Sequence, residues 1–115
     1  MQRVTLVRYA VKPERAAENE TLSKAVFAEL RATAPDKVGY ALFRDGLEFV
    51  HLFVNLKDDD SSPVTELPTF KTYVRDIVER CVEPPVSTRL TLQVLDSYGF
   101  PSASKEAPAS SAAAA

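Results

Sequence analysis

The sequence contains one cysteine, one histidine and no tryptophan among its 115 residues. A lone cysteine cannot form an internal disulfide, and one histidine with one cysteine cannot build the usual tetrahedral zinc site. The formal net charge is only −2, and no stretch of the chain gathers basic residues. The electrostatic attraction that drives nucleic-acid binding is therefore missing. We predict no structural metal and no nucleic-acid partner.

Long apolar runs are also missing. No run approaches the roughly 20 residues that are needed to span a bilayer. The first residues, which include Arg3 and Arg8, are too few and too charged for the hydrophobic region of a secretion signal. These absences predict a cytoplasmic protein without a membrane partner.

The remaining composition is that of an ordinary globular domain, with 45% apolar and 26% charged residues. Residues 1–100 have the length of one small domain. Residues 101–115 are almost entirely alanine, serine and proline. Because such a segment cannot bury enough apolar surface to offset its ordering entropy, we predict a disordered tail there.

The hydrophobic periodicity predicts an α+β fold. Period-two alternation with many β-branched side chains predicts strands over residues 3–11, 38–44, 48–56 and 86–95. A first helix is expected between Pro13 and Pro35. A second helix is expected to bury one apolar face and to leave Arg80 outside; that face comprises Phe70, Tyr73, Val74, Ile77, Val78 and Cys81. The order β-α-β-β-α-β is ferredoxin-like, with both helices on one face of one antiparallel sheet.

The middle strands are joined by Asp45-Gly46, a sequence typical of a type I′ hairpin turn. The predicted cross-strand pairs are Arg44–Leu47, Leu42–Phe49 and Tyr40–His51. One face of this hairpin then carries Tyr40, Leu42, Arg44, Phe49, His51, Phe53 and Asn55, and the other carries Ala41, Phe43, Val50, Leu52, Val54 and Leu56. Both faces are largely apolar, whereas a sheet with one wet face alternates apolar with polar residues. We predict a homodimer that buries one face, and the pattern leaves open which face meets the helices.

Three segments carry a resemblance to a known family. They are Tyr9-Ala10-Val11-Lys12-Pro13, Phe49-Val50-His51 and Leu67-Pro68-Thr69-Phe70-Lys71-Thr72-Tyr73. With them, residues 3–98 resemble the antibiotic-biosynthesis-monooxygenase-like proteins of the dimeric α/β-barrel superfamily. The resemblance implies two sheets that close into a barrel, with a cavity between the sheet and the helices of each subunit.

The resemblance also implies a function. The leading expectation is a cofactor-independent monooxygenase that acts on an aromatic or polyketide-like molecule. The alternatives are a non-catalytic ligand-binding or structural dimer, and an isomerase of the same fold. Haem-degrading relatives use an asparagine, a histidine and a tryptophan, so the absence of tryptophan argues against that activity.

Three residues are the candidates for chemistry. His51 could remove a phenolic or enolic proton, with Tyr40 and Asn55 orienting the substrate. The competing interpretations are a histidine that hydrogen-bonds to Tyr40 or backbone, and an asparagine that bonds its own loop.

The candidate ligand-binding residues are Tyr9, Arg44, Phe49, Phe53, Phe70 and Tyr73. Aromatic walls suit a flat apolar ligand, and an arginine could attract an anionic one. The competing interpretations are ordinary core packing for the aromatic residues and a solvated turn for Arg44. Cys81 is expected to be a buried core residue.

Overall fold

The computed structural model describes residues 3–57, 59, 61–91, 95–96 and 98–99. The predicted tail over residues 101–115 lies outside these residues, as do residues 92–94 of the predicted fourth strand. No helix in the described part of the chain is long and apolar enough to span a membrane.

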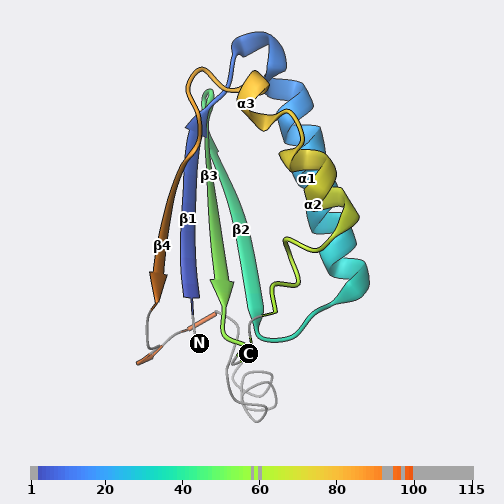
Figure 1. Ribbon diagram of the computed structural model, residues 1–115, viewed down its shortest axis with the longest axis vertical. Coiled ribbons are helices and arrows are strands. Elements are labelled where there is room, and N and C mark those ends of the chain that lie inside the picture. Colours follow the sequence, from blue (N-terminus) through green and yellow to red (C-terminus); the bar gives the residue numbers. More distant parts are fainter. Residues whose placement is uncertain (1–2, 58, 60, 92–94, 97, 100–115) are drawn as a thin grey trace.

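Four strands form one antiparallel sheet. They are β1 (Arg3–Ala10), β2 (Val38–Asp45), β3 (Glu48–Asn55) and β4 (Val86–Thr91). The strand order is β2-β3-β1-β4, with every neighbouring pair antiparallel. Figure 1 shows the helices gathered on one side of this sheet. The ferredoxin-like α+β prediction is therefore confirmed.

The hairpin register differs from the prediction by two residues. The observed pairs include Arg44–Phe49, Leu42–His51 and Tyr40–Phe53. The central turn residues are Gly46 and Leu47, and of these only Gly46 has a positive φ, at 60°. A glycine in that first central place is typical of a type II′ turn, not of the expected type I′. Because the shift is an even number of residues, every side chain stays on its predicted face.

The inward face of the sheet packs against the long helix α1 (Ala16–Thr33), which follows the short 3-10 turn η1 (Pro13–Arg15). Fully buried Phe49 on β3 and Val26 on α1 belong to one core cluster. The register places Tyr9, Val7 and Thr5 of β1 on this same face. The face that contains His51 therefore meets the helices, which resolves the alternative that the sequence left open.

The second predicted helix is broken. It consists of α2 (Pro68–Val74) and α3 (Ile77–Arg80). Between them Arg75 is extended, with ψ 132°, and Asp76 is left-handed, with φ 62°. The expected single apolar face is wrong at two positions, because Val74 is 42% and Val78 is 58% exposed.

Arg80 was expected outside but is buried, with 1% of its surface exposed. Its Nη2 donates to the carbonyl of Tyr73 at 2.5 Å, so it caps backbone at the break between the two helices. Cys81 is buried as expected, and burial raises the pKa of its thiol. Its backbone bridges to Val11, which ties the end of α3 to the end of β1.

Candidate functional site

His51 lies at the centre of a buried polar cluster on the inward face of β3. Its side chain is 1% exposed. Its Nδ1 is 2.5 Å from the hydroxyl of Tyr40, and its Nε2 is 2.7 Å from that of Tyr9 and 3.1 Å from that of Tyr73. Both ring nitrogens are thus engaged by protein hydroxyls. We call Tyr9, Asn19, Tyr40, His51, Tyr73 and Arg80 the histidine cluster.

Arg80 sets the direction of the hydrogen bonds in this cluster. A guanidinium only donates, so the contact of 2.9 Å from Arg80 Nε fixes the acceptor Oδ1 of Asn19 toward it. The amide nitrogen of Asn19 must then face Tyr9, to whose hydroxyl it donates at 3.0 Å. Ser23, one turn further along α1, donates to the backbone carbonyl of Asn19. The hydroxyl oxygen of Tyr9 is therefore an acceptor toward α1.

Counting protons then selects the tautomer of His51. If Nδ1 carries the proton, it donates to Tyr40, while Tyr9 donates to Nε2 and Tyr73 donates to Tyr9 at 2.6 Å. If Nε2 carries the proton, one hydroxyl proton of Tyr9 or Tyr73 has no acceptor among the contacts of the described residues. Those two tyrosines are 4% and 3% exposed, and an unsatisfied buried donor is costly. We assign the proton to Nδ1.

This assignment leaves one hydrogen-bond donor of the cluster without an acceptor among the described residues. The hydroxyl of Tyr40 accepts from His51, and its own proton has no acceptor among the contacts of residues 3–57, 59 and 61–91. The Tyr40 side chain is only partly buried, and its ring stacks between Phe27 and Phe53 with centroid distances of 4.4 and 4.3 Å. The cluster thus ends in a hydroxyl group that can still donate.

Burial keeps the imidazole and the three phenol groups of the cluster neutral. Desolvation lowers the pKa of His51 to about 4 and raises the pKa values of Tyr9, Tyr40 and Tyr73 above the usual range of a phenol. At neutral pH the imidazole is uncharged and can accept a proton only when the resulting charge is stabilised in place.

A pocket of about 430 Å³ lies next to the cluster on the same sheet face. Its walls are apolar at Val7, Val38, Phe53, Val64 and Phe70. Its polar lining includes Arg3, Thr5, Asn55, Ser87 and Arg89. His51 does not line it, but Phe53 links the two, with its ring centroid 6.3 Å from that of His51. Tyr40 lines a smaller hollow of about 270 Å³ that shares Val38 and Gly39 with the pocket.

The structure does not bring all the predicted site residues together in one place. Phe53, Phe70 and Asn55 line the pocket, whereas Tyr9, Phe49 and Tyr73 are buried in the core behind it. Asn55 is also bound to its own loop: it donates to the carbonyl of Ser61 and accepts from the backbone of Lys57. This is the local role that the sequence offered as its alternative to substrate orientation.

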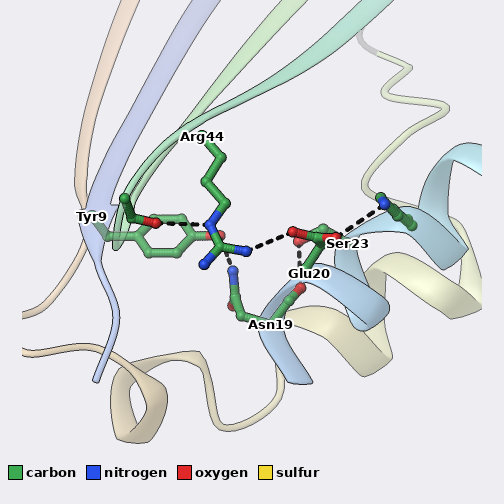
Figure 2. A network of polar contacts seen from close by, with 7 residues as sticks. Tyr9, Asn19, Glu20, Ser23 and Arg44 are labelled. Carbon is green, nitrogen blue, oxygen red and sulfur yellow. Dashed lines mark hydrogen bonds and ion pairs between the residues drawn. The ribbon is translucent and has the colours of Figure 1, made fainter. Parts of the chain in front are cut away.

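Arg44 lies away from the pocket, at the hairpin end of the sheet. It donates to the carbonyl of Gly46 and pairs with Glu20 of α1, both at 2.7 Å, and its guanidinium lies over the ring of Phe49. Figure 2 shows Arg44 extended to Glu20, with Asn19 of the same helix turned toward Tyr9. Arg44 therefore joins the sheet to α1 instead of lining the pocket.

Sequence reasoning missed Asn19, Ser23 and Arg80, although the spacing carried a signal. Asn19 and Ser23 precede Val26 and Leu30 at intervals of four, three and four, so they extend the apolar stripe of α1 as two polar residues on the inner face. Arg80 follows Tyr73 by seven residues, a spacing that returns to the same helix face. Polar residues in such places indicate a buried hydrogen-bond network.

Comparisons with known proteins agree with this architecture. Neither a protein-family model nor a curated protein matches the chain. Solved structures do match. Rv0793 from Mycobacterium tuberculosis has 19% identity and a TM-score of 0.67, covering 84% of this chain and 100% of that one. A protein from Nitrosomonas europaea, named provisionally as an antibiotic biosynthesis monooxygenase, has 13% identity and a TM-score of 0.66, covering 84% and 94%.

A third structure, from Caulobacter crescentus CB15 and provisionally named in the same way, has 20% identity and a TM-score of 0.65, covering 80% of this chain and 91% of that one. The chain has the fold of the antibiotic-biosynthesis-monooxygenase-like proteins. The resemblance inferred from sequence is thus confirmed for the fold. Within the described residues, this version of the fold contains no group of three or more His, Cys, Asp or Glu side chains that could hold a metal ion.

Proposed function

We propose that the chain binds a small, largely apolar molecule in the pocket between the sheet and the segment from Ser62 to Phe70. The pocket of about 430 Å³ is the observation that carries this proposal, because its size and apolar walls are those of a small-molecule site. Phe53 and Phe70, whose ring centroids are 6.1 Å apart at an interplanar angle of 78°, offer a face and an edge to a flat ligand.

Filling the pocket is expected to abolish binding. Ser87 lines the pocket from the edge strand β4 and is exposed, so a Ser87→Phe substitution adds a ring there without disturbing the core. Calorimetric titration with 2-naphthylmethanol, a neutral bicyclic probe, should show binding to the native chain and none to this variant. Thr21→Phe, at an exposed position on α1, is the matched control and should bind normally. Equal binding by all three proteins would place the ligand elsewhere.

A cofactor-independent monooxygenase is the second candidate function. Two observations favour it: the provisional names of the proteins that share the fold, and the histidine cluster, which ends in the donating hydroxyl of Tyr40. In such a reaction an anthrone loses a proton to become an enolate, and the enolate reduces dioxygen. The ring carbon that bore two hydrogens becomes a carbonyl, and water leaves. His51 would act through Tyr40, because it does not itself line the pocket.

We also propose that the outward face of the sheet binds a second copy of the chain. Its members alternate with the core residues along every strand, and the apolar ones are Val4, Leu6, Ala10, Ala41, Phe43, Val50, Leu52, Val54, Val86 and Leu90. Phe43 remains 55% exposed and Leu90 48% exposed. A contiguous apolar face of this kind usually marks an interface, and an uncharged centre suits an identical face related by twofold symmetry.

A charge in the middle of this face is expected to separate the subunits. Leu52→Asp should shift the native mass from two chains to one while leaving the circular dichroism spectrum unchanged, since Leu52 points away from the core. Val78→Asp, at a helix residue that is 58% exposed, should leave the dimer intact. Native mass spectrometry provides the measurement. A native chain that is monomeric at micromolar concentration would contradict the proposal.

A further inference from the structure

Two arginines lie together in the pocket without a carboxylate. Arg3 on β1 pairs with Thr91, and Arg89 on β4 pairs with Thr5, so the two arginines occupy diagonal positions on neighbouring strands. Such positions are about 7–8 Å apart, within reach of two long side chains. Both line the pocket, whose described lining includes no aspartate or glutamate.

None of the ion pairs observed among the described residues involves Arg3 or Arg89. The five observed pairs use Arg8, Arg15, Lys24, Arg44 and Lys57. Asp59, the described carboxylate of the loop beside Arg3, accepts from the backbone and hydroxyl of Ser61 instead. Asp58 and Asp60 lie outside the described residues. Within the described chain, two like charges thus share one side of an apolar pocket.

Arg3 is already held in place. Its Nη2 donates to the carbonyl of Ser61 at 3.1 Å, and the same carbonyl accepts from Asn55 at 3.0 Å. A guanidinium carries five N–H donors, so most of those on Arg3 remain for another partner. For Arg89, no hydrogen bond or ion pair is observed with the described residues. Arg3 is therefore oriented by the protein, and the N–H donors of Arg89 remain for another partner. Both side chains can then donate hydrogen bonds to one ligand anion.

We propose that the pocket selects a small aromatic molecule that bears a carboxylate, with Arg3 and Arg89 binding the carboxylate and with Phe53 and Phe70 binding the ring. This proposal rests on the small-molecule function proposed above and adds the chemical class of the ligand. Guanidinium groups bind carboxylates through paired, charge-assisted hydrogen bonds, which are stronger inside an apolar pocket than in water. A bound anion would also relieve the repulsion between the two arginines.

The test is calorimetric titration at pH 7 with two probes that share a naphthalene ring. 2-Naphthoate carries a negatively charged carboxylate, and 2-naphthylmethanol carries a neutral hydroxymethyl group in its place. The native chain should bind 2-naphthoate about tenfold more tightly, the size of one charge-assisted hydrogen bond. Arg89→Gln and Arg3→Gln should each remove that advantage and leave 2-naphthylmethanol binding unchanged. Arg75→Gln, at an exposed position outside the pocket, removes the same charge and should change neither affinity.

The outcomes separate the two proposals. Equal affinities for both probes, unaltered by either pocket variant, would overturn the anion selection while leaving the pocket in place. An equal loss of both probes in Arg89→Gln would also overturn it, because the arginine would then act on the shape of the site. If neither probe binds the native chain, the small-molecule function fails together with its ligand class. Arg89→Gln alone decides the matter if Arg3→Gln does not fold, because Arg89 is exposed.

Discussion

Replacing His51 with alanine is expected to abolish the turnover of a polycyclic phenol by this chain. Dioxygen uptake with 1,8-dihydroxyanthrone provides the measurement, and the rate should fall at least about 100-fold, the usual contribution of one hydrogen-bond donor to a developing oxyanion. The physical reason lies in the hydrogen bond of 2.5 Å between Nδ1 and the hydroxyl of Tyr40. Without the imidazole, Nδ1–H no longer holds the hydroxyl of Tyr40 so that its own proton can point to the oxygen of the forming enolate.

Tyr40→Phe distinguishes a role of His51 that acts through Tyr40 from a merely structural role. It removes the terminal hydroxyl but retains the ring that stacks on Phe27 and Phe53, so the fold should survive while turnover falls. Tyr98→Phe removes a hydroxyl from a side chain that is 96% exposed and should change nothing. Unchanged turnover in the alanine variant would remove His51 from the mechanism. No turnover by the native chain would reject the oxygenase, and the binding function would then be judged by its own titration.

The part of the fold that could be predicted is the part that depends on hydrophobic periodicity. Alternation along β2 and β3 gave the correct faces, because a pleated strand sends successive side chains to opposite sides whatever its partner. The register needed the turn type as well. Asp45-Gly46 suits a type I′ turn, but the chain places Gly46 in the first central position and closes the hairpin with the Asp45–Glu48 pair. Local sequence allowed both solutions, and the pairing of whole strands decided between them.

The break between α2 and α3 could not be predicted from periodicity, because the apolar stripe from Phe70 to Cys81 continues across it. The left-handed Asp76 interrupts the helix, and beyond it Val78 is 58% exposed whereas Arg80 is buried. What stabilises that turn is tertiary: Arg80 contacts Asn19 on α1 and the carbonyl of Tyr73. A contact between residues that lie 61 positions apart leaves no trace in a local pattern.

The contact between His51 and Tyr40 could be predicted, but the other connections of the histidine cluster could not. His51 and Tyr40 do meet, although they are not cross-strand partners, because both side chains lie on the inward face. The role of Tyr9 as the link to α1 depends on Asn19, whose polar side chain is buried on that helix. Arg3 and Arg89 come together only when β4 pairs with β1, the step that closes the sheet.

Lowering the pH from 7 to 5 is expected to remove about 2 kcal/mol from the free energy of unfolding through His51 alone. Burial lowers the pKa of His51 to about 4 in the folded chain, against 6.5 for an exposed imidazole. Between these values the unfolded chain binds a proton that the folded chain does not, so stability falls as the pH falls. The contribution is complete above about pH 6.5 and is lost by about pH 4.

Urea denaturation of the native chain and of His51→Gln at pH 7, 6 and 5 measures this effect. His51 is the only histidine in the sequence, so the variant should lose the slope between pH 7 and 5. Neighbouring lysine and arginine side chains lower the pKa values of paired carboxyl groups such as Glu20 and Asp36. These groups therefore change the stability at lower pH, and they do so in both proteins. Equal slopes in the two proteins would mean that His51 is hydrated in the folded state. Burial would not keep a hydrated imidazole neutral, and the assignment of its proton to Nδ1 would lose its basis.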